Sequence, residues 1–207
     1  MDAFTTLTAT AVPVDLPNVD TDQIIPARFL GRAREEQAPA LFHDMRRTPE
    51  GALREDFPLN REGFRGAGIV VAERNFACGS SRETAVTVMV DNGLKAFIAP
   101  SFGDIFFNNC FQNGALPIRL DAARVAELRA QLHDRPGAAI AIDLAAQTVR
   151  GPDGKTDRFE IDSFRKDCLL KGVDEVNLTL GYEAEIAAFE ARQHKEMSWL
   201  DGAAGED

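Results

Sequence analysis

The sequence has little cysteine and histidine, which argues against a metal centre built by this chain. Three cysteines and three histidines are scattered over 207 residues. The cysteines are odd in number and lack CxxC spacing, so we expect free thiols in a reducing compartment. The isolated histidines do not form a zinc or iron–sulfur ligand pattern either. We therefore expect no metal on this chain. These residues are Cys78, Cys110, Cys168, His43, His133 and His194.

An excess of positive charge and long apolar runs are also absent. The net charge is −10, whereas nucleic acids and anionic membranes favour clustered positive charge. No apolar run approaches the ~20 residues that span a bilayer. Residues 1–10 lack the basic start and apolar centre of a signal peptide. We expect a cytoplasmic protein with neither a nucleic acid nor a membrane as its partner.

The hydrophobic content, 44%, is sufficient for a sizeable core. Residues 68–73 and 94–100 have the pattern of buried strands, and residues 78–93 between them have the pattern of a helix. This βαβ unit predicts an α/β fold with parallel strands. We expect one domain over residues 1–207, with a flexible tail from about residue 195.

The remaining segments alternate between strand and helix patterns. Residues 4–26 predict short strands and loops, with a turn at Thr21 and Asp22. Residues 28–65 are polar and irregular, which is typical of a functional or surface loop. Further along, we expect helices over 101–114, 121–137, 162–172 and 182–195, a strand over 115–120, and two strands around the GPDGK turn within 138–161.

The stretch "GSSRE", residues 79–83, carries the main functional hypothesis. Ser80 and Glu83 fit a capping box, which by itself would explain both residues. Three features favour an anion site instead: consecutive N–H groups at a helix start, the planar fork of Arg82, and a position after a buried strand. A second serine, Ser81, is more than capping requires.

Familiar nucleotide and hydrolase motifs do not match this stretch. It contains neither GxGxxG nor GxxxxGK[ST], so a dinucleotide or phosphate loop has little support. It is not the GxSxG elbow, and no histidine lies near it in the sequence. A conventional serine triad is therefore improbable.

Four separated motifs resemble the family of 3-isopropylmalate dehydratase small subunits in the aconitase superfamily. They are "VDTDQIIPARFL", "AERNFACGSSRE", "APSFGDIFFNNCFQNGALPI" and "DSFRKDCLLKGVDEVNLTL", in family order from about Val19 to Leu180. The resemblance implies a swivelling β/β/α domain with a mixed, partly barrel-like sheet flanked by helices. It also implies a hydro-lyase that interconverts 2-isopropylmalate and 3-isopropylmalate by dehydration and rehydration in leucine biosynthesis.

The resemblance also implies partners and residue roles. A large subunit would carry the [4Fe–4S] cluster, in a heterodimer or heterotetramer acting on a small anionic hydroxy acid. Ser80 matches the family's proton-transferring base. Ser81, Arg82 and Asp22 match substrate-binding positions.

The segment from Arg28 to Arg34 matches a loop that helps recognise substrate in this family. Arg32 and Arg34 are the candidate substrate ligands in this loop. The alternative, to which we give equal weight, is a solvated basic loop that binds no substrate. The chain departs from the family after the motif, because "SSRET" replaces the usual "SSREH". Thr84 therefore stands where a histidine is expected and is a candidate specificity residue.

This departure leaves the substrate open. One alternative is a related hydro-lyase for citraconate/2-methylmalate, dimethylmaleate or homoaconitate. Another is a noncatalytic anion-binding module. Retention of Ser80, Ser81 and Arg82 favours an enzyme, because a simple binding module has no need of the base.

Overall fold

The computed structural model describes residues 1–197 and residue 199, apart from the side chains of residues 175–177. The chain divides into two compact units, one over Met1–Gly172 and one from Val173 onward. The expectation of one domain over residues 1–207 stays a prediction. The first unit contains the whole sheet and every residue of the predicted site.

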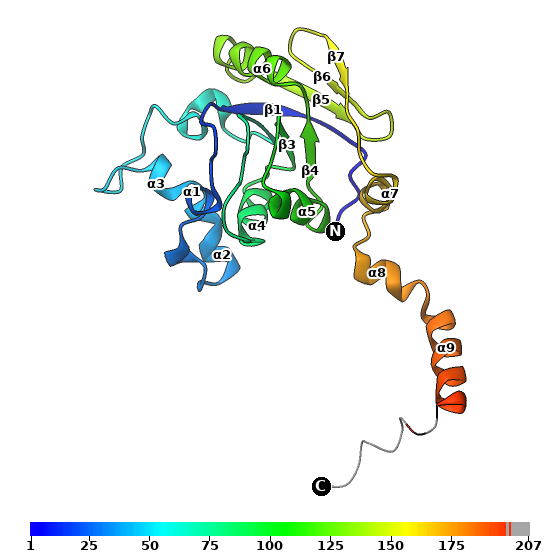
Figure 1. The fold of residues 1–207 in the computed structure, drawn as a ribbon. Helices are drawn as coiled ribbons and strands as arrows, with labels where there is room; N and C mark the ends of the chain where they lie inside the picture. Colours follow the sequence, from blue (N-terminus) through cyan, green and yellow to red (C-terminus); the bar gives the residue numbers. More distant parts are fainter. Residues whose placement is uncertain (198, 200–207) are drawn as a thin grey trace. The chain divides into compact units, whose positions relative to one another are not determined.

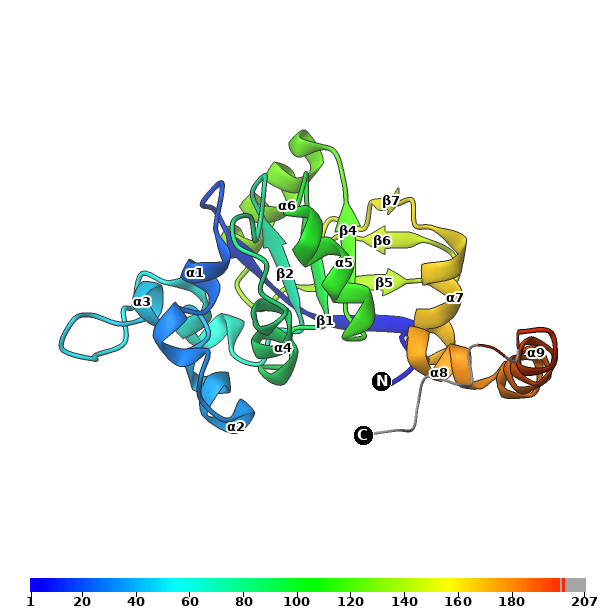
Figure 2. The same cartoon turned by 60° about the horizontal axis from the view of Figure 1, so that its bottom comes forward.

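Seven strands in the described part of the chain form one mixed sheet, in the order β4-β3-β2-β1-β5-β6-β7. The long strand β1 joins its two halves (Figures 1 and 2). Residues 11–14 of β1 pair with β2 in parallel, whereas residues 6–10 pair with β5 in antiparallel register. The strands are β1 Thr6–Val14, β2 Ile69–Ala72, β3 Ala96–Ala99, β4 Leu116–Arg119, β5 Ala139–Asp143, β6 Thr148–Arg150 and β7 Thr156–Arg158.

Helices cover both faces of the parallel half of the sheet. Figure 1 shows α6 on one face and α4 and α5 on the other. The α-helices are α1 Thr21–Ile24, α2 Arg34–Gln37, α3 His43–Arg46, α4 Thr84–Asp91, α5 Asp104–Gln112, α6 Ala122–Asp134, α7 Ser163–Lys171, α8 Glu175–Leu180 and α9 Glu183–Glu196. Short 3₁₀ helices are η1 Ala27–Phe29, η2 Ala38–Ala40, η3 Pro58–Asn60 and η4 Glu62–Phe64.

The parallel strands are apolar because helices bury both of their faces. Every residue of β2 and β3 is buried, as expected for parallel strands enclosed on two sides. On α6, Val125, Leu128 and Leu132 form the buried stripe. The predicted α/β class with a mixed sheet flanked by helices is therefore confirmed, and so is the parallel pairing of β2 with β3.

Three predictions of secondary structure were wrong. Residues 4–26 contain one nine-residue strand rather than short strands, because β1 spans both halves of the sheet. Residues 138–161 form three strands rather than two, because a turn after Asp143 separates β5 from β6. The helix expected from residue 78 begins only at Thr84.

The unit from Val173 onward contains α8 and α9. The sequence pattern predicted α9 and missed α8. The tail predicted from about residue 195 overlaps the last residues of α9, and residues 198 and 200–207 lie outside the described part of the chain.

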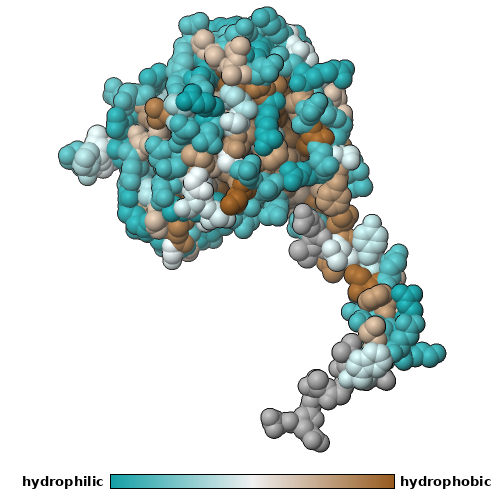
Figure 3. All heavy atoms as spheres, viewed as in Figure 1, coloured by the Kyte–Doolittle hydropathy of each residue, from teal (hydrophilic) through white to brown (hydrophobic). Residues whose placement is uncertain are grey.

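The molecular face in Figure 3 is mainly hydrophilic over the first unit, with small apolar patches between polar side chains. Scattered apolar patches of this kind are normal on a protein surface. Among the described residues, no helix is long and apolar enough to cross a membrane.

Candidate functional site

The loop after β2 begins with an anchored phenylalanine. Phe76 is fully buried, and its ring meets those of Phe102 and Phe106 edge to face. Its backbone N–H donates to the carbonyl of Ser101 at 3.0 Å, and its own carbonyl accepts from Gly103 at 2.9 Å. The loop that follows β2 is thus fastened to the loop that follows β3.

Close backbone contact shapes this loop. A Cβ on Gly103 would lie 2.4 Å from the Ala77 carbonyl oxygen, so only glycine fits there. Asn75 and Ala77 have φ near +56°, in the left-handed region that non-glycine residues rarely adopt. The surrounding contacts must maintain this conformation, which is common at ligand sites.

Residues 79–83, here called the GSSRE loop, lie between this anchor and α4. Helix α4 begins at Thr84, and its N-cap, Glu83, makes no side-chain capping bond. The predicted capping box of Ser80 and Glu83 is therefore wrong. The Glu83 carboxylate instead accepts from Asn113 Nδ2 at 3.0 Å, so Ser80 has no capping role that would explain it.

The GSSRE loop presents unused hydrogen-bonding groups. Ser80 and Ser81 are exposed. Within the described residues, neither hydroxyl makes a hydrogen bond, and the backbone N–H groups of residues 79–83 have no acceptor. Free consecutive N–H groups ahead of a helix form a cradle suited to an anion.

Arg82 reaches from this loop to a distant segment. Its Nη1 donates to Asp22 Oδ1 at 2.5 Å, and its Nη2 donates to Asp22 Oδ2 at 2.9 Å. Nη1 also donates to the Ile25 carbonyl at 3.2 Å. The Arg82 side chain is only 14% exposed, whereas that of Asp22 is 53% exposed. The structure thus brings together two predicted site residues that are 60 positions apart in the sequence.

Helix α1 is fastened to the same loop by its first residue. The Thr21 N–H donates to the Cys78 carbonyl and the Thr21 hydroxyl donates to the Ser80 carbonyl, both at 2.9 Å. Asp20 caps α1 by accepting from the Gln23 N–H at 2.8 Å, and the Gln23 side chain returns to the Asp20 N–H. The turn expected at Thr21 and Asp22 is therefore a short capped helix.

Thr21 was missed as a site residue by sequence reasoning. It is 2% exposed and the only polar residue among the buried ones in the described chain. The D-x-x-Q spacing of Asp20 and Gln23 is a capping-box signal that could have located α1. The contact of Thr21 with Ser80 has no signal in the sequence, because it joins residues 59 positions apart.

The arginine segment, residues 28–34, is already engaged with other groups. Arg28 forms a bidentate pair with Asp44, and Arg34 forms one with Asp91 in which both hydrogen bonds are 2.8 Å long. The guanidinium of Arg32 lies 4.7 Å from the ring centre of Phe29 and makes no hydrogen bond in the described part of the chain.

Arg34 pairs with the end of α4 that lies away from the GSSRE loop. Its partner Asp91 is the last residue of α4, whereas the loop precedes the first. The pKa of Arg34 is raised by its hydrogen bonds to Asp91 and, more weakly, by the charge of Glu83 in the loop. No hydrogen bond in the described structure joins Arg34 to Ser80 or Arg82.

Asp44 forms a charged cluster with Arg28 and His43. Hydrogen bonds from the Arg28 guanidinium and from His43 lower the pKa of the Asp44 carboxyl to about 2. The same pairing raises the pKa of Arg28. This cluster is charge-compensated and stabilises the loop without offering a free cation.

Thr84 begins α4 and is half-buried. Its carbonyl accepts from the Thr87 hydroxyl at 3.3 Å. Because Ser80 lies in the loop before the helix, the two residues are not neighbours on one helix face. Thr84 could contact a substrate only from the point where the GSSRE loop enters α4.

The described cysteines do not form a ligand set for an iron–sulfur cluster. Cys110 is fully buried, and burial raises the pKa of its thiol, which disfavours a thiolate ligand. Cys78 is a free thiol directly before the GSSRE loop. Among the described residues, no three His, Cys, Asp or Glu side chains are close enough to hold a metal ion.

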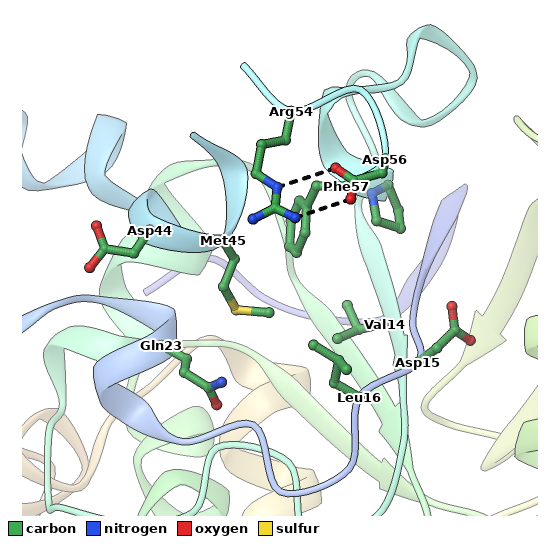
Figure 4. A pocket seen from close by; sticks show the side chains of 10 residues that line it. Val14, Asp15, Leu16, Gln23, Asp44, Met45, Arg54, Asp56 and Phe57 are labelled. Atoms are coloured by element: carbon green, nitrogen blue, oxygen red, sulfur yellow. Dashed lines mark hydrogen bonds and ion pairs between the residues drawn. The ribbon is translucent and has the colours of Figure 1, made fainter. Parts of the chain in front are cut away.

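A separate cavity of about 430 Å³ lies between the end of β1, α1, α3 and residues 54–58 (Figure 4). Val14, Leu16 and Met45 give it apolar walls. Arg54 faces Asp56 and lowers the pKa of that carboxyl. The GSSRE loop contributes no residue to its lining, so the cavity is distinct from that loop.

Family comparisons agree with this arrangement. Residues 1–123 match the Aconitase C-terminal domain, and residues 126–163 match LeuD_N. Residues 177–203 match the C-terminal domain of the 3-isopropylmalate dehydratase small subunit. The first match covers more than half of the chain and includes the GSSRE loop.

Individual proteins are similar over nearly the full length. The 3-isopropylmalate dehydratase small subunit of Paramagnetospirillum magneticum is 48% identical over 97% of this chain and 100% of its own length. That of Leptospira interrogans is also 48% identical, over 97% of this chain and 98% of its own length.

A solved structure supports the same assignment. The crystal structure of 3-isopropylmalate dehydratase (leuD) from Methanocaldococcus jannaschii superposes with a TM-score of 0.64, at 26% identity, over 91% of this chain and 99% of that chain. Fold, matched domains and full-length similarity agree. The chain therefore belongs to the family of 3-isopropylmalate dehydratase small subunits, the hydro-lyase components of the aconitase superfamily.

Proposed function

We propose that this chain, together with a large subunit, interconverts 2-isopropylmalate and 3-isopropylmalate by dehydration and rehydration in leucine biosynthesis. Membership of the small-subunit family supports the reaction class. The observation that carries the site assignment is the exposed Ser80 hydroxyl beside free backbone N–H groups and the fixed fork of Arg82. An anionic hydroxy acid requires such positive groups.

Ser80 is proposed to move the substrate proton. A serine hydroxyl ionises far above neutral pH, so an anionic Oγ needs strong local stabilisation. The free N–H groups of the loop, the start of α4 and Arg82 would supply it. In the dehydration direction Ser80 Oγ takes a proton from one substrate carbon, the electrons of that C–H bond form the double bond, and hydroxide leaves the neighbouring carbon. Rehydration adds hydroxide to the double bond and returns the proton from Ser80. A cluster on the large subunit would supply Lewis-acid assistance to the departing hydroxide.

Ser81 and Arg82 are proposed to hold a substrate carboxylate. Arg82 offers charge-assisted hydrogen bonds, and the Ser81 hydroxyl offers a further donor. Arg32 is the better-placed candidate of the arginine segment for a second carboxylate, because its guanidinium is not occupied by an acidic group in the described structure. Arg34 has its Nε and Nη2 edge paired with Asp91, so only the Nη1 side of its guanidinium is unused in the described structure.

A large subunit is proposed to carry the [4Fe–4S] cluster and to complete the enzyme as a heterodimer or heterotetramer. The relatives' designation as small subunits supports such a partner. The unsuitable cysteine positions in this chain also favour a cluster held elsewhere.

Reconstitution tests this proposal. The purified chain alone should show no iron–sulfur absorption and no turnover, whereas its mixture with a cluster-loaded large subunit should interconvert the two isopropylmalates. Turnover by the isolated chain would contradict the proposed division of roles. An inactive complex that still binds the hydroxy acid would favour the noncatalytic anion-binding module.

One observation favours a second candidate substrate. Thr84 replaces the histidine expected in the family motif and is the first residue of α4, directly after the GSSRE loop. A related hydro-lyase for citraconate/2-methylmalate, dimethylmaleate or homoaconitate would share the proton and carboxylate chemistry. A side-by-side profile of these acids with the reconstituted complex would distinguish the candidates by kcat/KM.

A further inference from the structure

The Arg82 guanidinium uses one of its edges within the protein and leaves another unused. Its terminal edge, formed by Nη1 and Nη2, donates hydrogen bonds to the two carboxylate oxygens of Asp22. The second hydrogen of Nη1 is donated to the Ile25 carbonyl. Arginine has five N–H donors in a fixed plane. Within the described residues, Nε and the remaining Nη2 hydrogen have no acceptor, and these two form the side edge of the fork.

We propose that Asp22 is a positioning residue that holds Arg82 end-on, so that the Nε and Nη2 edge receives the substrate carboxylate. This inference rests on the proposed function of Arg82 and adds the edge it uses and the residue that orients it. Asp22 acts on the substrate through Arg82. Its own oxygens are already directed at the guanidinium.

Electrostatics favours this division between the two carboxylates. A substrate carboxylate placed directly against Asp22 would put two like charges together, which is unfavourable. With Arg82 between them, each carboxylate meets a different edge of one cation. A planar guanidinium can make two such bidentate contacts, whereas a lysine ammonium cannot.

The backbone around Asp22 is built to hold its position. Asp22 is the second residue of α1, directly after Thr21, which donates both to Cys78 and to Ser80 in the loop that carries Arg82. Capping by Asp20 and Gln23 closes the helical turn. The two ends of the Asp22–Arg82 pair are therefore tied together by backbone as well as by charge.

A double-mutant cycle in the reconstituted complex tests the proposal. Asp22→Ala should raise KM more than it lowers kcat, with a loss in kcat/KM of about 10²-fold from misplacement of the binding group. In an Arg82→Ala background, Asp22→Ala should cause almost no further loss of kcat/KM, because Asp22 acts on the substrate only through Arg82. Additive losses would overturn the proposal, since they would mean that Asp22 acts on the substrate independently.

A matched control separates positioning from general loss of an ion pair. Asp56→Ala removes the partner of Arg54, which is another bidentate pair at the surface and lies outside the GSSRE loop. This variant should keep the wild-type KM. A rise in KM equal to that of Asp22→Ala would contradict a specific role of Asp22.

Nuclear magnetic resonance of the arginine side chains of the full chain gives a readout independent of turnover. The Arg82 Nη signals should show slow rotation of the guanidinium in the wild type. Asp22→Ala should make this rotation faster. Equal rotation in both proteins would overturn the proposal even in an active complex. Conversely, an inactive wild-type complex that shows this difference would count against the proposed function and in favour of the Asp22–Arg82 geometry.

Discussion

The GSSRE loop and the arginine segment were both candidate anion sites in the sequence, yet their structures differ. In the GSSRE loop, Arg82 is largely buried and keeps one edge of its guanidinium unused in the described structure. In the arginine segment, Arg28 and Arg34 also have one edge paired with a carboxylate, but both side chains are more than half exposed. A count of local positive charge cannot distinguish these cases.

Besides a carboxylate support and an unused edge, a binding arginine therefore needs shielding from solvent and free donors beside it. Asp22 supports Arg82, and the neighbouring N–H groups of residues 79–83 have no acceptor among the described residues. Arg34 has an equally good carboxylate partner in Asp91, but its side chain is 61% exposed and that partner is the last residue of α4. An arginine that has a carboxylate partner but no free backbone N–H groups beside it is an ordinary surface ion pair. Such pairs contribute little stability.

The largest expected effect concerns Ser80. Ser80→Ala should lower kcat of the reconstituted complex by about 10²-fold or more, because it removes the proposed base. The free energy of unfolding should change by less than about 0.5 kcal/mol, since the exposed hydroxyl has no partner in the described structure. Steady-state kinetics and thermal melting measure the two quantities.

Ser163→Ala is a matched control for Ser80→Ala, because Ser163 is an exposed serine at the start of α7. It should leave both kcat and stability unchanged. If Ser80→Ala retained wild-type kcat, the proposed base would have to be assigned to another residue.

The next effect concerns the fork of Arg82. Arg82→Lys keeps the charge but loses the bidentate geometry, and a charge-assisted hydrogen bond contributes about 1.5–3 kcal/mol. We expect KM to rise roughly tenfold or more, with a smaller change in kcat. An unchanged KM, measured over a substrate titration, would remove Arg82 from carboxylate binding.

A smaller effect should separate two members of the arginine segment. Arg32→Ala should raise KM several-fold, because Arg32 has no carboxylate partner in the described structure. Arg34→Ala should change KM less, since Asp91 already occupies the Nε and Nη2 edge of a largely exposed side chain. Parallel titrations of the two variants test this order, and a larger effect of Arg34→Ala would show that the Asp91 pair opens when substrate binds.

The smallest effect concerns Asp44 and acid stability. Arg28 and His43 lower the Asp44 pKa to about 2, below the value of ~3.9 typical of an unfolded chain. The pair therefore contributes stability above about pH 4, and this contribution is lost as pH falls towards 2. Because the Arg28 and Asp44 side chains are both more than half exposed, Asp44→Asn should remove less than about 1 kcal/mol.

Denaturant unfolding at pH 7 and pH 2 measures this contribution. The difference in stability between wild type and Asp44→Asn should be present at pH 7 and should shrink at pH 2. A difference that grows on acidification would contradict the sign of the Asp44 pKa shift.

Local sequence pattern was sufficient for the parallel half of the fold. The continuous apolar runs of β2 and β3 and the apolar spacing of α6 are properties of neighbouring residues, so the sequence alone predicted these elements. The family motifs likewise predicted the small-subunit family, which full-length similarity confirmed. The start of α4 was predicted wrongly, because S-x-x-E also occurs in a loop.

Apolar periodicity and residue type are local properties, so they were enough to predict the βαβ core and the chemical groups of the GSSRE loop. Which cations keep an unused edge, and which residues support them, depends instead on contacts between distant segments. Arg82 meets Asp22, and Ser80 meets Thr21, across about 60 residues. Such pairs form only when β1 and β2 lie side by side in the sheet, and no local pattern encodes that placement.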